Sequence, residues 1–218
     1  DFFAGIGGRR DKHPGTAMAM ATIASAVGTV IAGLYVLVFP PGEFGADDLA
    51  WSLGAMAFMI FARPLLYLGM ERGPMVVFAP VLGVVSLILP ALAVPIVGDS
   101  LSILELVGVV LALPAVVLIV SEGGLPSISH LVQSQALRLG LIVGTLISGV
   151  SICLGQVDEG AGAMPALVMQ AGAVVLIPVL TRPILPMAPF SRTVLRFGLL
   201  VGAVDIGAVI ASTVAFQT

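Results

Sequence analysis

The fold is decided by residues 63–122, which read RPLLYLGMERGPMVVFAPVLGVVSLILPALAVPIVGDSLSILELVGVVLALPAVVLIVSE. The 26 residues from 73 to 98 contain no charged side chain, and about 20 apolar residues let a helix cross the hydrocarbon core of a membrane. Apolar segments precede and follow this stretch across the short polar joints MERGP and GDS. These joints predict antiparallel membrane helices, because an open sheet would leave backbone polar groups unpaired in lipid.

The composition of the whole chain agrees with this interpretation. Its 218 residues are 59% hydrophobic and 10% charged, with a mean hydropathy of +1.17, whereas soluble domains carry about 25% charged residues. A soluble core of this composition would leave large apolar patches in water. We therefore expect an all-α polytopic membrane protein whose solvent is the lipid bilayer. The single cysteine, Cys153, can form no internal disulfide.

The apolar segments predict about seven full transmembrane helices and a partial first one. Residues 1–8 read as the end of that first helix, since the chain begins without Met. Trp51 and Tyr67 fall near the ends of the third helix, where aromatic side chains reach the membrane interface. The full helices are expected at residues 15–39, 49–70, 74–97, 101–120, 136–157, 161–180 and 193–218.

The charged residues predict the orientation of these helices. Cytoplasmic loops are enriched in Lys and Arg, and here the basic residues follow helices one, three, five and seven, whereas the joints after helices two, four and six are acidic. The loops at 9–14, 71–73, 122–135 and 182–192 are therefore expected on the cytoplasmic side of the plasma (inner) membrane. The basic residues are Arg9, Arg10, Lys12, Arg72, Arg138, Arg182, Arg192 and Arg196.

One motif carries a family resemblance. The segment Gly98–Ser102 (GDSLS) is followed by Glu105, Leu106, Gly108 and Leu111. This pattern resembles G-[DE]-x-L-S-x-x-[EQ]-L-x-G-x-x-L of the EamA-type transporters in the drug/metabolite transporter superfamily, although that family usually has Glu-Arg or Glu-Lys where this chain has Asp-Ser. The resemblance implies a secondary transporter of small metabolites or drug-like molecules. It would work by alternating access, without a covalent step or a cofactor, coupled to protons or to a counter-substrate.

A weak internal repeat suggests how such a bundle is organised. Residues 18–27 (MAMATIASAV) resemble residues 165–174 (PALVMQAGAV), although any two helices rich in Ala and Gly look alike. The repeat divides the chain into a first unit at 1–121, a cytoplasmic linker at 122–134 and a second unit at 135–218. Five helices per unit would invert the second copy, as in many secondary transporters. Helices nine and ten and part of helix one would then be missing.

Four polar residues in apolar helices are the candidates for substrate binding or coupling, because ionisable groups are expensive inside a membrane. Asp1, Arg63 and Asp205 each lie eight or nine residues from a basic cytoplasmic end, a depth of roughly 12–14 Å. A bidentate contact between Arg63 and Asp205 would join two helices. The pair could be structural, could bind a substrate or proton, or could fail to form. Gln170 lies mid-helix, where hydrogen bonding between helices is the first expectation.

Other functions find less support in the sequence. Neither His13 nor His130 lies in a predicted helix, and no residue cluster has metal-ligand spacing. Basic residues are too sparse for nucleic-acid binding. The alternatives are an integral-membrane enzyme acting on a lipid-linked substrate and a structural membrane subunit. The small-residue faces at residues 140–144 and 198–202, both GxxxG in spacing, predict close helix packing, with homodimer formation as a second use.

Overall fold

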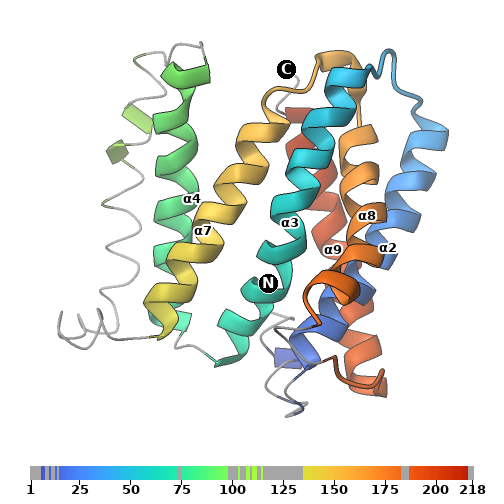
Figure 1. Ribbon diagram of the computed structural model, residues 1–218, viewed down its shortest axis with the longest axis vertical. Coiled ribbons are helices and arrows are strands. Elements are labelled where there is room, and N and C mark those ends of the chain that lie inside the picture. Colours follow the sequence, from blue (N-terminus) through green and yellow to red (C-terminus); the bar gives the residue numbers. More distant parts are fainter. Residues whose placement is uncertain are drawn as a thin grey trace.

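The computed structural model describes residues 6–7, 10, 13, 15–72, 75–97, 135–182 and 187–215, and isolated residues between 103 and 114. In these parts the chain is all-α. Six α-helices lie side by side, and helices joined by a short loop run antiparallel (Figure 1). They are α2 (Thr16–Val38), α3 (Ala46–Arg72), α4 (Met75–Val97), α7 (Gln135–Leu154), α8 (Met164–Leu180) and α9 (Arg192–Ala215).

Four of the described helices are long and apolar enough to cross a membrane, so the protein is a multi-pass membrane protein. They are the helices at Thr16–Val38, Ala46–Glu71, Gln135–Leu154 and Arg192–Ala211. Two shorter apolar helices, Val77–Ala93 within α4 and Met164–Leu180, accompany them. The prediction of about seven full spans is therefore wrong for the described residues. The predicted helix at 101–120 and the linker at 122–134 fall outside the description, apart from isolated helical residues.

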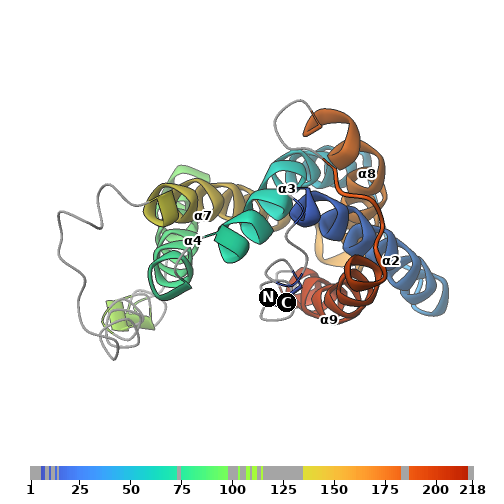
Figure 2. The same ribbon diagram turned by 90° about the horizontal axis from the view of Figure 1, so that it is seen from below.

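Helix α3 occupies the centre of the assembly. It contacts α2, α4, α7 and α8, and in the view from below it separates α4 and α7 from the group formed by α2, α8 and α9 (Figure 2). Small side chains on α3, including Ser52, Ala55 and Ala62, are almost fully buried. Such residues let neighbouring membrane helices approach closely. A helix surrounded in this way can place one side chain against several others.

Both predicted glycine faces are packing surfaces within the chain. A Cβ at Gly144 would lie 2.7 Å from a side-chain carbon of Val85 on α4, and a Cβ at Gly202 would lie 2.9 Å from the Ala24 backbone on α2. At such distances a side chain would force the helices apart. The sequence prediction of close packing is confirmed for α7 on α4 and for α9 on α2.

The start of α3 and the end of α7, which lie near acidic loop residues, differ from the predicted boundaries. Helix α3 begins at Ala46, not near residue 49, because Asp48 stabilises its first turn: Asp48 Oδ2 accepts a hydrogen bond from the Gly45 N–H at 2.8 Å. This is half of a capping box. Its Oδ1 accepts from the Asp158 N–H at 2.9 Å. Helix α7 ends at Leu154, and a 3₁₀ turn (Glu159–Ala161) takes up the residues where the next helix was expected to begin.

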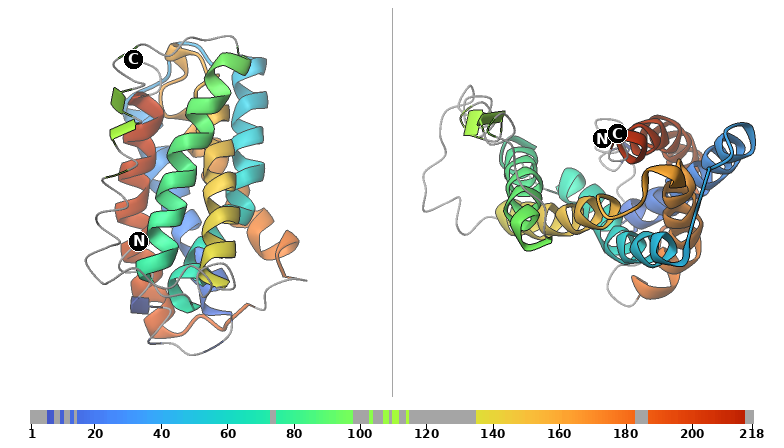
Figure 3. Two further views of the ribbon diagram at one scale, coloured as in Figure 1. Left: turned by 90° about the vertical axis from the view of Figure 1, so that its left-hand side faces the viewer. Right: turned by 90° about the horizontal axis from the view of Figure 1, so that it is seen from above.

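The helix axes share one direction, so the helix ends gather at two opposite faces (Figure 3). One face holds the start of α2, α7 and α9 and the end of α3 and α8, near which the described basic residues Arg10, Arg138, Arg182, Arg192 and Arg196 lie. The other face holds Glu43, Asp47, Asp48, Asp158 and Glu159. The fold thus separates the basic ends from the acidic ends, with Glu71 as an acid at the basic face.

Candidate functional site

The side chain of Arg63 is the centre of a polar cluster inside the helix bundle. Arg63 lies on α3, and only 3% of it is exposed. Its Nη1 donates hydrogen bonds to Ser25 Oγ at 2.7 Å and to Gln170 Oε1 at 2.6 Å. Its Nη2 donates to Asp205 Oδ2 at 2.8 Å. A guanidinium carries five N–H donors in a fixed plane, and here three acceptors lie around that plane.

The contact between Arg63 and Asp205 confirms the predicted ion pair between α3 and α9. Its geometry differs from the prediction, because a single N–O contact forms instead of a bidentate one. The other terminal nitrogen, Nη1, donates instead to Ser25 and Gln170. Asp205 is less enclosed than Arg63, with 32% of its side chain exposed. The predicted hydrogen bonding of Gln170 between helices is also confirmed.

Each partner of Arg63 comes from a different helix. Ser25 belongs to α2, Gln170 to α8 and Asp205 to α9. The approach of α2 to α8 depends on Gly28, because a Cβ there would lie 2.7 Å from Gln170 Nε2. Glycine at position 28 therefore leaves room for the Gln170 side chain that reaches Arg63. One buried cation joins four of the six described helices.

A cavity of about 170 Å³ borders this cluster, between α3, α7 and α9. Tyr67, expected at the membrane interface, is instead 3% exposed and lines this cavity. Tyr67 lies in the last two turns of α3, near the helix end as predicted, and its side chain is enclosed by neighbouring helices. We call this space the Arg63 cavity. It is lined by Met59, Ala62, Arg63, Leu66, Tyr67, Ile147, Val150 and Asp205.

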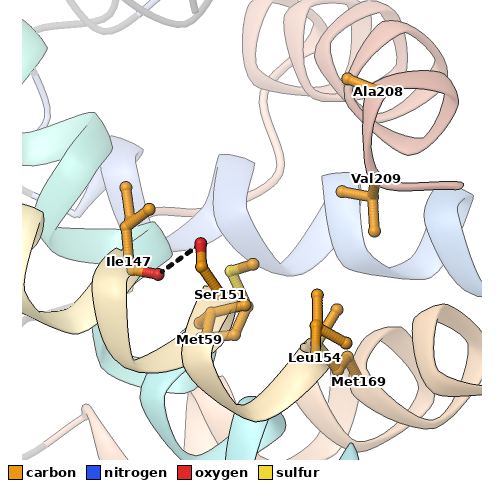
Figure 4. A pocket seen from close by; sticks show the side chains of 8 residues that line it. Met59, Ile147, Ser151, Leu154, Met169, Ala208 and Val209 are labelled. Carbon is orange, nitrogen blue, oxygen red and sulfur yellow. Dashed lines mark hydrogen bonds between the residues drawn. The ribbon is translucent and has the colours of Figure 1, made fainter. Parts of the chain in front are cut away.

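A second cavity of about 240 Å³ adjoins the first and extends toward the acidic face. The two share Met59, Ile147 and Val150. Figure 4 shows the side chains of α3, α7, α8 and α9 around it. Its polar group is Ser151, whose hydroxyl donates to the Ile147 carbonyl of its own helix at 3.2 Å. This Ser151 cavity is otherwise apolar, with Leu154, Met169, Ala208 and Val209 completing its lining.

The structure unites three of the four residues selected from the sequence, namely Arg63, Gln170 and Asp205. Asp1 lies outside the described residues. Sequence reasoning missed Ser25 and the inward position of Tyr67. In the part of the chain that the structure describes, no group of three or more His, Cys, Asp and Glu could hold a metal ion.

The cluster offers a shielded cation and a partly exposed carboxylate, both beside an apolar space within the span of the helices. Buried ion pairs in membrane proteins mark packing junctions or pathways for ions and substrates. The adjoining cavities favour a site that accepts a ligand.

The chain was compared with protein-family models, curated proteins and solved structures, and nothing in any of the three matches it.

Proposed function

We propose that the protein is a secondary transporter, which moves a small metabolite or drug-like molecule across the plasma membrane by alternating access. One observation carries the proposal: the Arg63–Asp205 pair, with Arg63 buried and Asp205 partly exposed, borders a half-open cavity between α3, α7 and α9. A purely structural pair needs no adjoining space, whereas a carrier needs a polar group that a substrate can reach from within the membrane. The resemblance of GDSLS and the residues that follow it to EamA-type transporters points the same way.

The pairing of helices supports an inverted repeat. In such a repeat α2 corresponds to α8, and α3 corresponds to α9. The contacts come in matching pairs, since α2 packs on α9 as α3 packs on α8, and α2 also contacts its own counterpart α8. Related helices meet near the centre of many secondary transporters, where the substrate binds. We infer units at 1–121 and 135–218 on this basis, with the basic face in the cytoplasm.

Two other classes of function remain as alternatives. An integral-membrane enzyme acting on a lipid-linked substrate would place its reactive groups near one interface. The described polar cluster lies instead well inside the bundle, about nine residues from the end of α3, or roughly 13 Å. A structural membrane subunit would use the pair only to hold its helices together, and the two adjoining cavities favour a carrier over that role.

Uptake into proteoliposomes tests the proposal. The purified protein is reconstituted and offered labelled amino acids, sugars and cationic drugs under a proton gradient and under counterflow. We expect uptake of at least one compound above empty liposomes, and loss of that uptake in Arg63→Met. Val30→Ala is the matched control, because Val30 is 62% exposed on α2 and lines neither cavity. The absence of uptake for every compound, with a folded protein in the vesicles, would refute a transport function.

A further inference from the structure

We infer that the Arg63 cavity binds the ammonium group of an amphipathic organic cation, and that Asp205 is the residue that contacts it. The inference rests on the proposed function and names the class of substrate. It follows from which side chain of the ion pair is exposed, and from the residues that line the cavity.

The guanidinium of Arg63 is less accessible to a ligand than the carboxylate of Asp205. Both hydrogen bonds of Nη1 go to Ser25 and Gln170, on α2 and α8, and neither of these residues lines the Arg63 cavity. Although Arg63 borders the cavity, only 3% of its side chain is exposed. Its charge is paired with Asp205, and the neutral acceptors Ser25 and Gln170 occupy Nη1. An anionic ligand would therefore meet a guanidinium that is almost fully enclosed and already paired with a carboxylate.

The carboxylate of Asp205 is the charged group that a ligand can reach. Arg63 uses only Oδ2, and no residue in the described part of the chain donates a hydrogen bond to Oδ1. The side chain lines the cavity and is 32% exposed. A carboxylate oxygen accepts hydrogen bonds and cannot donate them when ionised. The complementary group is an N–H donor with a positive charge, because charge-assisted hydrogen bonds are roughly twice as strong as neutral ones.

The rest of the cavity fits the apolar body of such a ligand. Tyr67 supplies an aromatic side chain to the lining that contains Asp205, and aromatic faces attract organic cations. Met59 lines both cavities, and methionine side chains adapt to irregular ligand shapes. The two cavities, at about 170 and 240 Å³, are adjacent and together reach the usual size of small-molecule sites, about 300–1,000 Å³. The ammonium would lie at Asp205 and the apolar part would extend toward Ser151.

Three probes of similar size and different charge test this assignment. They are phenethylammonium, 2-phenylethanol and phenylacetate, which share the phenyl group and differ at the polar end. Binding to the purified protein in detergent is measured by isothermal titration calorimetry at neutral pH. We expect phenethylammonium to bind about tenfold or more tightly than 2-phenylethanol, the ratio expected for one charge-assisted contact. Phenylacetate should be the weakest ligand.

Variants assign the preference to Asp205. Asp205→Asn should remove the preference for the cation while leaving the affinity for 2-phenylethanol within about twofold, which also reports that the cavity is intact. Asp205→Glu keeps the carboxylate and should retain the preference. If Asp205→Asn alone does not fold, the double change Arg63→Met with Asp205→Asn removes both charges and serves the same purpose. Val30→Ala, at an exposed position of α2 that lines neither cavity, should bind like the unchanged protein.

The outcomes separate this inference from the transport function. Four results would each overturn the inference. They are equal binding of the three probes, tighter binding of phenylacetate, no binding of any probe, and a cation preference that survives Asp205→Asn. If sugars or acidic compounds are nevertheless taken up by proteoliposomes, the protein is a transporter with another class of substrate. If no compound of the uptake panel is transported while phenethylammonium binds at Asp205, the cation site stands and the transport function fails.

Discussion

The ion pair between Arg63 and Asp205 should show a large energetic coupling. We consider Arg63→Met, which keeps an apolar stem of similar length, and Asp205→Asn, which keeps the side-chain shape. Arg63→Met removes the donor of three hydrogen bonds, of 2.6 to 2.8 Å. Asp205→Asn removes only the charge of one acceptor, and the guanidinium keeps Ser25 and Gln170. Arg63→Met therefore leaves three acceptors without their donor, whereas Asp205→Asn leaves the guanidinium without its counter-charge.

The structure sets the expected magnitudes. Two unit charges about 4 Å apart interact by about 4 kcal/mol at an effective dielectric constant of about 20. Because Asp205 is 32% exposed, we reduce the coupling to about 2–3 kcal/mol. Removing one partner of a buried pair costs about 3–5 kcal/mol, which we expect for Arg63→Met. Asp205→Asn should cost about 2–3 kcal/mol, and the double variant about as much as Arg63→Met alone.

The assay is the free energy of unfolding from SDS titration in mixed micelles, measured for both single variants and the double variant. The control cycle replaces Arg63→Met by Ser52→Ala. Ser52 is fully buried on the same helix but donates only to the Asp48 carbonyl of α3. Ser52→Ala and Asp205→Asn should therefore be additive within about 0.5 kcal/mol. If Arg63→Met and Asp205→Asn are additive to the same degree, the two charges do not interact in the folded protein and our reasoning is refuted.

Three further predictions concern helix packing, helix capping and orientation. Gly202→Ala should lower the melting temperature, since its Cβ would lie 2.9 Å from the α2 backbone, whereas Gly207→Ala on the same helix meets nothing within 4 Å and should leave it unchanged or raise it; equal shifts would contradict this. Asp48→Ala should cost about 1–2 kcal/mol in unfolding experiments through the lost cap, and the exposed neighbour change Asp47→Ala should cost less than half of that. In a background without the native cysteine, Asp47→Cys should react with an impermeant thiol reagent from outside the cell and Pro189→Cys should not; the reverse result would invert the topology.

The described membrane helices could be located from composition, although the predicted number of about seven full spans was wrong for the described residues. A helix in lipid must be apolar over its length, so α2, α4 and most of α9 follow directly from runs of apolar residues. The boundary of α3 could not be predicted in this way. Asp47 and Asp48 look like loop residues in sequence, yet Asp48 stabilises the first turn of α3 by accepting from Gly45 and binds the Asp158 backbone as well. The second of these contacts depends on a loop about 110 residues away.

Site residues could be predicted where their type is rare in membrane helices, and could not be predicted where their type is common there. Arg63 and Asp205 stand out because charges are rare in membrane helices. Ser25 does not, since most helical serines and threonines bond to a carbonyl of their own helix, as Ser52 does. Only the fold shows that Ser25 accepts a bond from Arg63, 38 residues along the chain. The inward position of Tyr67 could not be predicted from the sequence either, because aromatic residues near helix ends usually face the interface.

The position of the Arg63 cluster links the proposed repeats to the proposed mechanism. Arg63 and Ser25 belong to the first unit, and Gln170 and Asp205 to the second. If the two units rock against each other, the Arg63–Ser25 bond within the first unit can persist. The bonds from Arg63 to Gln170 and Asp205 join the two units and must stretch or exchange. A cation bound at Asp205 Oδ1 would weaken the hold of that carboxylate on Arg63, because the two cations share one acceptor. Substrate binding would then loosen the contact that joins the units, which is the coupling between occupancy and movement that alternating access requires.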